Sequence, residues 1–284
     1  MNHNSLDLFE ALNTAETIAR QAGTILRSFY ERPRQSITKS TVIDLVTEAD
    51  KTSEAFIVKA LREAFPNHHI NGEEGGGYGP SAEDAPYQWW VDPLDGTTNF
   101  AHRFPVFAVS LAMSTPDHHP VLGVVHNPMY DETYKGLRGG GAMLNGRPLH
   151  VSDVDTLAEA LAVTGFPYDA WTAEDNNAER IGHFLVRTQG VRRVGSAALD
   201  ICTVAAGRCD LYWERGPQPW DVQAGIVIVE EAGGKVTDYE GGWSEDAYFG
   251  HRIVVSNSLL HEQALDVIRL GDAAPRPVLA HGTD

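Results

Sequence analysis

The segment WVDPLDGTTNF contains the side chains best suited to chemistry, because it holds two carboxylates three positions apart. At this spacing Asp92 and Asp95 lie on the same side of a turn, and Pro93 restricts the backbone between them. Asp, Pro and Gly also make up ordinary surface turns, so this segment alone does not distinguish a functional site from a turn. Acidic residues elsewhere in the chain help to distinguish a functional site from an ordinary turn.

Backbone groups that follow the second aspartate add an anion-binding feature. Gly96 lets the backbone approach a ligand closely, because it has no side chain. The amides of Gly96, Thr97 and Thr98 open a helical turn, and free amides at such a position favour an anion. The segment therefore combines carboxylates with a possible anion cradle.

Three further acidic segments accompany this motif. Glu73 follows a short predicted strand, Asp50 ends the run DLVTEAD, and Asp221 stands at the head of an apolar helix. If Glu73 and Asp221 converge with the two aspartates of the motif, unit charges about 4 Å apart repel by roughly 4 kcal/mol at an effective dielectric constant near 20. Divalent cations relieve such repulsion, and oxygen ligands without His or Cys favour Mg²⁺ or Mn²⁺ over zinc. This combination indicates phosphoryl chemistry.

Taken together, the motifs G-E-E, D-P-L-D-G-T-T-N-F and W-D-V resemble the signature of the inositol monophosphatase superfamily, over nearly the whole chain. The resemblance implies an α/β (α+β) fold, a layered αβαβα sandwich of the inositol monophosphatase/fructose-1,6-bisphosphatase type. It also implies dependence on two or three Mg²⁺ ions, with Mn²⁺ as a substitute, together with lithium sensitivity and a homodimer.

The same resemblance assigns roles to individual residues. Its metal ligands correspond to Glu73, Asp92, the backbone carbonyl of Leu94, Asp95 and Asp221, with Asp92 bridging two ions. Catalytic assistance to the attacking water is assigned to Glu73 and to a hydrogen-bonded pair, Thr97 and Asp50.

Substrate contacts follow from the resemblance in the same way. The phosphate and the polyol hydroxyls are expected to contact Gly96, Thr97, Thr98, Ala197, Glu214, Asp221 and Lys39. A lone lysine such as Lys39 is more often a solvated surface charge. Asp200 stands where several family members carry Asn, which either alters the substrate end of the pocket or faces solvent.

The identity of the substrate stays open among related phosphate esters. Thr98-Asn99-Phe100 resembles the polyol-phosphate branch, whereas the nucleotide-phosphate branch tends to carry Lys-Glu-Phe, so inositol 1-phosphate is the first expectation. Fructose 1,6-bisphosphate, histidinol phosphate and the phosphate of a dinucleotide remain alternatives, because pocket-lining loops select among them. A non-catalytic role in a bacterial transcription complex is a further alternative.

Periodicity supplies the elements that must position these residues. Apolar spacing predicts a helix over 6–30 and another over 51–65, with Asp50 or Thr52 as its N-cap. An antiparallel sheet is predicted from strands at 88–91, 106–114, 121–126 and 133–138. Later strands are predicted at 162–164, 210–213, 235–237 and 253–256, and later helices at 176–189, 197–206, 221–232 and 259–270. We expect residues 1–150 to carry the metal motifs and residues 151–284 to complete the site, in one compact unit.

Composition excludes several classes of partner. The 284 residues are 42% hydrophobic, enough for a substantial core. The 22 Lys and Arg against 39 Asp and Glu give a formal charge of −17, which opposes direct binding to nucleic acid or anionic membranes. The N-terminal region lacks a basic segment followed by an apolar run, and no stretch approaches the roughly 20 apolar residues of a membrane span. We therefore expect a cytoplasmic protein without membrane attachment.

Overall fold

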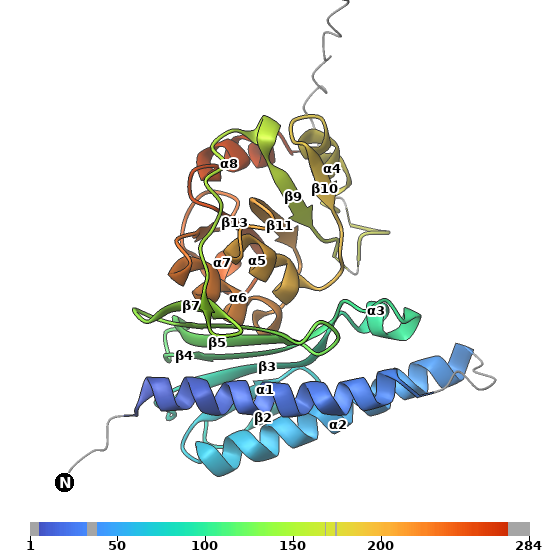
Figure 1. The fold of residues 1–284 in the computed structure, drawn as a ribbon, viewed down its shortest axis with the longest axis vertical. Helices are drawn as coiled ribbons and strands as arrows, with labels where there is room; N and C mark the ends of the chain where they lie inside the picture. The colour runs from blue at the N-terminus through green and yellow to red at the C-terminus, as the bar shows by residue number, and fades with distance from the viewer. Residues whose placement is uncertain (1–5, 33–38, 168, 174, 272–284) are drawn as a thin grey trace, which may run out of the picture.

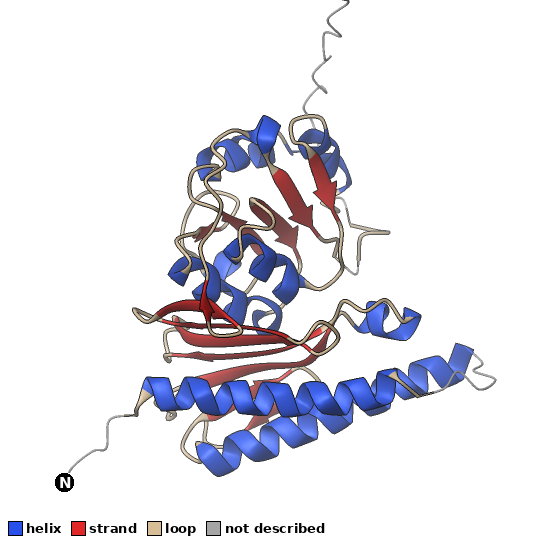
Figure 2. Ribbon diagram, viewed as in Figure 1, coloured by secondary structure: helices blue, strands red, loops and turns tan. Residues whose placement is uncertain are grey.

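The chain folds into five layers in the order helix, sheet, helix, sheet, helix (Figures 1 and 2). A computed structural model describes residues 6–32, 39–167, 169–173 and 175–271, and of residues 39–45 it describes the backbone alone. Helices α1 and α2 form the base, α5 and α6 lie between the two sheets, and α4 and α8 cover the outer face of the second sheet. The predicted αβαβα sandwich is confirmed.

The elements follow one another along the chain with well-defined bounds. The helices are α1 (Leu8–Tyr30), α2 (Lys39–Ala64), α3 (Thr97–His102), the 3₁₀ turn η1 (Leu157–Glu159), α4 (Ala178–Leu185), α5 (Ala197–Ala205), α6 (Pro219–Glu231), α7 (Glu245–Tyr248) and α8 (His261–Arg269). The strands are β1 (His69–Gly72), β2 (Gly76–Tyr78), β3 (Gln88–Asp95), β4 (Ala108–Ser114), β5 (Pro120–Asn127), β6 (Glu132–Leu137), β7 (Gly141–Leu144), β8 (Arg147–Pro148), β9 (Leu161–Thr164), β10 (Gly190–Arg192), β11 (Leu211–Arg215), β12 (Lys235–Thr237) and β13 (Arg252–Ser256).

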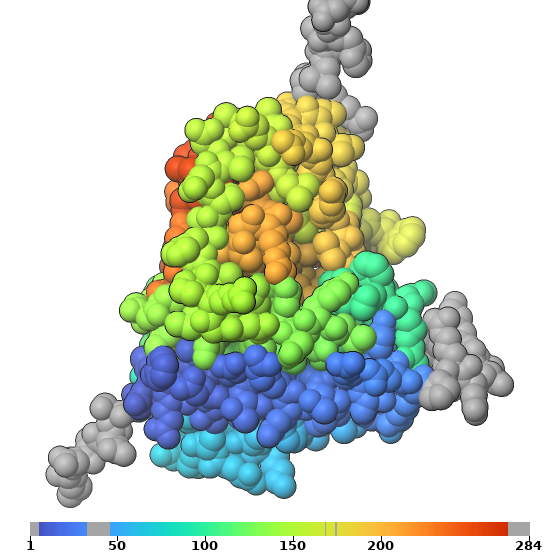
Figure 3. Space-filling view, viewed as in Figure 1, coloured from blue at the N-terminus to red at the C-terminus, as the bar shows by residue number. Residues whose placement is uncertain are grey.

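Two sheets carry the fold. The first has eight strands in the order β2-β1-β3-β4-β5-β6-β7-β8, antiparallel except for the parallel pair β1 and β3. The second has five strands in the order β10-β9-β11-β13-β12. Figure 3 shows the N-terminal residues as the base and the C-terminal half packed directly above them. The boundary at residue 150 falls between the sheets, and the division into residues 1–150 and 151–284 within one compact unit stays a prediction.

The second helix differs from its predicted start. The prediction placed Asp50 at an N-terminus, whereas α2 begins at Lys39 and Asp50 lies well inside it. Asp50, Ser53 and Glu54 are buried polar residues that interrupt the apolar pattern on the face turned toward the acidic residues described below. Because helix bounds are predicted from the spacing of apolar residues, such an interruption looks like the start of a helix, although the helical backbone continues through it.

The helix predicted over 176–189 is also shorter than expected. Asn177 has a left-handed backbone with φ of 68°, and its side chain accepts a hydrogen bond from Trp213 Nε1 at 2.6 Å. This side chain therefore closes a loop, and α4 begins only at Ala178. Within the part of the chain that the structure describes, no helix is long and apolar enough to cross a membrane.

Helix α6 lies unusually close to the first sheet, and glycine makes this possible. A Cβ added to Gly123 of β5 would stand 2.5 Å from the carbonyl oxygen of Ala224 in α6. We expect Gly123→Ala to lower the free energy of unfolding by about 1–3 kcal/mol, because neither backbone can yield without moving a whole element. Urea denaturation measures this change. Gly242→Ala is the control, since the nearest atom to its added Cβ lies at 3.4 Å, and equal stability losses in both variants would contradict the prediction.

Candidate active site

Three aspartates converge where the first sheet meets the central helices. Carboxylate oxygens of Asp92, Asp95 and Asp221 lie within 4.8 Å of one another. The first two come from the end of β3, and the third from the first turn of α6. Glu73, at the turn between β1 and β2, lines the same cavity from its exposed rim. The four acidic side chains that the sequence singled out as ligands therefore face one cavity.

A local break in the strand pairing shapes the motif. The register of β3 against β4 shifts between Asp92 and Asp95, which turns the intervening backbone out of the regular ladder. The Leu94 amide donates to Asp92 Oδ1 at 2.8 Å, and the Ser53 hydroxyl of α2 donates to the Pro93 carbonyl at 3.1 Å. The motif is thus a bulged strand end rather than the free turn expected from its composition.

The residue after the motif starts a helical turn. Gly96 has φ of 94°, a left-handed conformation that strongly favours glycine, and it immediately precedes α3. The amides of Thr97 and Thr98 belong to the first turn of α3, so they have no acceptor within the helix. Both residues line the cavity, which leaves these amides suited to a phosphate oxygen.

Asp95 is stabilised by the beginning of α5. Its Oδ2 atom accepts hydrogen bonds from the Ser196 hydroxyl at 2.6 Å and from the Ala198 amide at 2.8 Å. These bonds, together with the Ala197 amide, partly oppose the effect of burial, which raises the pKa of Asp95. Ala197 itself lines the cavity, as the resemblance implied. Asp95 therefore joins the first sheet to the central helix layer.

Electrostatic crowding is strongest at the other two aspartates. Burial raises the pKa of Asp92 well above its usual range, and the neighbouring charges of Glu73 and Asp95 raise it further. The pKa of Asp221 is raised well above its usual range in the same way, first by burial and then by Asp95. Loss of hydration raises the pKa of the Glu73 carboxyl to about 7, although its hydrogen bond to Asp92 opposes the shift. The negative charge of such a cluster is compensated by a bound cation or by protons on the carboxylates.

The donor set fits a hard divalent cation. The carboxylates of Glu73, Asp92, Asp95 and Asp221 offer oxygen atoms alone, and no His or Cys belongs to the described cluster. Oxygen donors of this kind suit Mg²⁺ or Mn²⁺. The Leu94 carbonyl, the fifth predicted ligand, lies between the two aspartates of the motif and accepts a hydrogen bond from the Thr97 hydroxyl at 3.2 Å.

The predicted pairing of Thr97 with Asp50 differs from the observed contacts. The Thr97 hydroxyl donates to Leu94, and among the described residues no hydrogen bond joins it to Asp50. Burial raises the pKa of Asp50 to about 8, and the charge of Glu73 adds to this shift. The charge of Glu73 in the cavity therefore acts on Asp50, but the hydrogen bond of Asp50 to Thr97 stays a prediction.

Glu54, which the sequence analysis did not select, fixes the turn that carries Glu73. It lies one helical turn after Asp50 on α2 and is buried. Its carboxylate accepts the Glu74 amide at 2.9 Å and the Tyr78 hydroxyl at 3.1 Å. The glycine-rich segment after Glu73 thus forms strand β2 of a hairpin that is held against α2. The spacing of Asp50 and Glu54 could have indicated that both lie on one helix face, but not what Glu54 contacts.

The cavity above the cluster has a volume of about 690 Å³, which suits a small molecule. Its walls come from β3, α3, α5, β11, α6 and the loop after β9. Of the predicted substrate contacts, the described lining includes Gly96, Thr97, Thr98, Ala197, Glu214 and Asp221. The side chain of Lys39 lies outside the described residues, so its role stays a prediction.

Glu214 and Asp200 form a second acidic pair toward the substrate end. Burial raises the pKa of Glu214 to about 7, against the hydrogen bond that it accepts from the Tyr212 hydroxyl at 2.8 Å. Asp200 is 1% exposed, so it does not face solvent. Burial and the charge of Glu214 raise its pKa well above the usual range, and neither of its oxygens accepts a hydrogen bond of ordinary geometry from the described residues.

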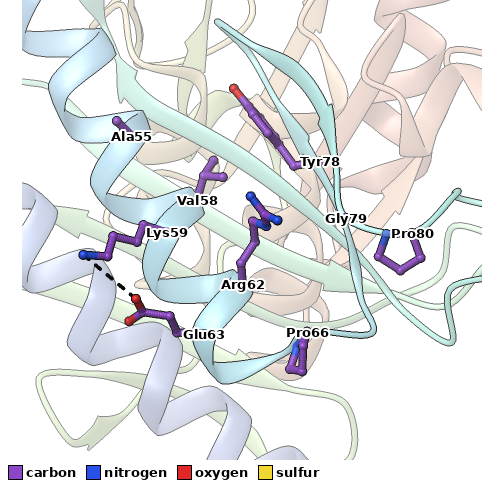
Figure 4. A pocket seen from close by; sticks show the side chains of 9 residues that line it. All are labelled: Ala55, Val58, Lys59, Arg62, Glu63, Pro66, Tyr78, Gly79 and Pro80. Carbon is purple, nitrogen blue, oxygen red and sulfur yellow. Dashed lines mark ion pairs between the residues drawn. The ribbon is translucent and has the colours of Figure 1, made fainter.

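A separate hollow lies between α2 and β2 (Figure 4). Val58 and Arg62 of the helix face Tyr78 of the strand, and Lys59 pairs with Glu63 at 3.9 Å on the outer side. Tyr78, which lines this hollow, donates its hydroxyl to Glu54, the residue that also holds the Glu73 turn. It shares none of its described lining residues with the acidic cavity.

Comparisons with known proteins agree with this geometry. The model of the inositol monophosphatase family matches residues 7–270. The chain is 44% identical over 257 residues to an inositol-1-monophosphatase of Synechocystis, which covers 90% of this chain and 88% of that protein. It is 42% identical over 269 residues to the Nus factor SuhB of Pseudomonas aeruginosa, covering 91% and 95% of the two chains.

A solved structure shows the same similarity in three dimensions. An inositol monophosphatase from Anabaena (Nostoc) superposes with a TM-score of 0.84 at 42% identity, covering 94% of this chain and 98% of that one. The matched range of residues 7–270 includes both sheets and all the acidic segments of the cavity. The chain therefore belongs to the inositol monophosphatase family and is a hydrolase of phosphate monoesters.

Proposed function

We propose that this protein hydrolyses the phosphate monoester of a small polyol in an Mg²⁺-dependent reaction, with inositol 1-phosphate as the first substrate to test. The observation that carries this proposal is the convergence of three carboxylates within 4.8 Å on a cavity of about 690 Å³. The similarity to proteins named inositol-1-monophosphatase supports the choice of substrate.

One set of cavity residues would bind the metal ions. Glu73, Asp92, Asp95, Asp221 and the Leu94 carbonyl would hold two or three Mg²⁺ ions, or Mn²⁺ in their place. When bound, these ions supply Lewis-acid polarisation of the phosphoryl oxygens and lower the pKa of a nearby water.

Other residues of the protein would orient the substrate and accept the proton. The amides of Gly96, Thr97 and Thr98 orient the phosphate, while Ala197 and Glu214 contact the polyol hydroxyls. Glu73 and Asp50 would accept the proton that the attacking water releases, the role that the resemblance assigns to them.

A panel of phosphate esters tests the proposal. Phosphate release would be measured with and without Mg²⁺ from inositol 1-phosphate, fructose 1,6-bisphosphate, histidinol phosphate and 3′-phosphoadenosine 5′-phosphate. We expect Mg²⁺-dependent turnover that is greatest with inositol 1-phosphate and that is inhibited by lithium. Equal rates with and without the metal would contradict the mechanism, and a different ranking would replace the substrate.

A role in transcription is a second candidate, favoured by the similarity to the Nus factor SuhB. The intact acidic cluster supports retained catalysis, and the net charge of −17 opposes direct RNA binding. A pull-down with RNA polymerase, repeated after nuclease treatment, tests protein contact alone. Lack of retention would leave the phosphatase as the single role.

We also propose a homodimer, as the family resemblance implies, in which a second copy of the chain would cover exposed apolar residues such as Trp171 and Leu185, 96% and 59% exposed. Sedimentation velocity gives the oligomeric state directly. The cytoplasmic location stays a prediction from the sequence.

A further inference from the structure

Two residues that the sequence analysis did not select hold the carboxylate of Glu214, the acid expected to contact the polyol hydroxyls. Tyr212 lies two positions before Glu214 on β11, so both side chains point to the same side of the strand. The Tyr212 hydroxyl donates to Glu214 Oε2 at 2.8 Å. The tyrosine ring is 0% exposed and belongs to the apolar cluster between the two sheets. The donor of this hydrogen bond is therefore fixed by packing.

The Glu214 carboxylate also lies directly against the backbone of Gly165, the residue after β9. A Cβ added to Gly165 would stand 2.1 Å from each carboxylate oxygen of Glu214 and 2.2 Å from the carbon that joins them. The φ of Gly165 is not positive, so its backbone conformation alone does not require glycine. The close approach of Glu214 does require it, because any larger residue would occupy the place of the carboxylate.

Neighbouring elements fix Gly165 in turn. Thr164, the last residue of β9, pairs with Trp213 of β11, and Asn177 Nδ2 donates to the Gly165 carbonyl at 2.7 Å. The Trp213 indole donates to the side chain of Asn177, which is 0% exposed, at 2.6 Å. The surface on which the Glu214 carboxylate lies is therefore held by two strands and a buried amide.

We propose that Tyr212 and Gly165 are positioning residues that hold Glu214 for the hydroxyl groups of the substrate, and that they thereby set the preference of the cavity for polyol phosphates over esters without hydroxyls. Glu214 lines the cavity, and a carboxylate has about four acceptor positions, so the bond from Tyr212 leaves others for a ligand. A side chain that is already ordered loses little conformational entropy when the substrate binds. The proposal rests on the phosphatase activity proposed above and identifies what selects its substrate class.

Inositol 1-phosphate and cyclohexyl phosphate test this assignment as a matched pair, because the second has the same carbon ring without hydroxyl groups. The measured quantity is the ratio of kcat/KM for inositol 1-phosphate to kcat/KM for cyclohexyl phosphate at saturating Mg²⁺. We expect Tyr212→Phe to lower this ratio about tenfold, the effect of losing a hydrogen bond to a charged group. Gly165→Ala should lower the ratio at least as much, because its added methyl group meets the end of the Glu214 side chain and displaces it.

Tyr134 supplies a matched control. It is 1% exposed, and its hydroxyl donates to Glu132, two positions away on β6, at 2.9 Å. It does not line the described cavity, so Tyr134→Phe should leave the ratio unchanged. If Tyr212→Phe and Gly165→Ala lower kcat/KM equally for both esters, the two residues act through folding or through the metal cluster, and the proposal is wrong.

A double substitution tests whether Tyr212 acts through Glu214. Glu214→Ala removes the carboxylate and should lower the ratio by itself. Tyr212→Phe added to Glu214→Ala should then lower it no further, because the group that the hydroxyl holds is gone. A second fall of about tenfold in the double variant would contradict the proposal.

Crystal structures of the wild type and of both single variants separate this proposal from the proposed reaction. We expect the Glu214 carboxylate to leave its place beside Gly165 in Gly165→Ala, and to occupy more than one conformation in Tyr212→Phe. A carboxylate that keeps its place in both variants would overturn the positioning roles, whatever the turnover. Absence of turnover of both esters by the wild type would overturn the proposed reaction, whereas a displaced carboxylate would still support the positioning roles.

Discussion

Replacing Asp92 with Asn is expected to reduce Mg²⁺-dependent kcat by about a thousandfold or more, roughly 4 kcal/mol of lost transition-state stabilisation. Asp92 is 1% exposed, burial raises its pKa, and the charges of Glu73 and Asp95 raise it further. The amide keeps an oxygen that can accept the Leu94 amide, so the bulged strand end should persist. Phosphate release from the best substrate of the panel measures the loss.

The same substitution should stabilise the metal-free protein. Removing one carboxylate relieves the repulsion among the remaining acids, so thermal unfolding without Mg²⁺ should shift upward, while the stabilisation that Mg²⁺ gives the wild type should largely disappear. Asp153→Asn removes an exposed carboxylate outside the described cavity and is the matched control. A variant that keeps a large part of the activity would contradict the role of Asp92 as a ligand, and one that unfolds earlier without metal would show that Asp92 stabilises the fold.

The second large effect concerns pH and metal together. Without metal, thermal stability should fall as the pH rises from about 6.5 to 8.5, and saturating Mg²⁺ should remove most of this fall. The folded-state pKa values of Glu73 and Asp50, about 7 and about 8, lie above their ordinary values of 4.5 and 3.8. Such groups hold protons in the folded state that the unfolded chain has released. Their contribution is complete below about pH 4 and is lost as the pH rises through 7 and 8.

Three buried histidines destabilise the fold as the pH falls, rather than as it rises, and they set the lower limit of the pH range in which the acids can be studied. Burial lowers the pKa of His68, His126 and His261 to about 4, so their contribution is lost only as the pH falls below about 6.5. Above that pH they add no slope, and the acids can be observed alone.

Differential scanning calorimetry with and without Mg²⁺ gives the measurement. At a metal concentration one hundred times its dissociation constant, binding adds about 2.7 kcal/mol, which corresponds to about 5 °C or more in Tm. Ca²⁺-free and Mg²⁺-free buffers with a chelator serve as the baseline. A Tm difference that stays constant across this pH range would mean that the acids are not coupled to the metal.

Side-chain chemistry could be predicted from the sequence where the signal was local. Asp92, Asp95 and the residues after Gly96 stand in one short segment, so their types and spacing indicated a carboxylate and amide site without knowledge of the fold. The strands and helices that flank it followed from hydrophobic periodicity, because alternating and helical spacing reflect which face is buried. The layered sandwich was implied by the family resemblance, which rests on motifs spread along the chain.

Local patterns failed where function interrupts periodicity. Asp50 was taken as a helix start, because Asp50, Ser53 and Glu54 present polar groups on a buried face of α2. The motif around Pro93 was taken as a free turn, but its pairing with β4 makes it a bulged strand end. In both cases a contact with a distant element overrode the local preference.

By itself, the sequence determined the donor types, the approximate elements and the kind of reaction, since these depend on residue identity and short-range spacing. Tertiary structure alone decided which groups meet. Ser196 binds Asp95 across 101 positions, Glu54 holds the Glu73 turn, and Arg193 enters the acidic cavity. Such contacts depend on how sheets and helices pack over long separations, and no spacing within one segment encodes them.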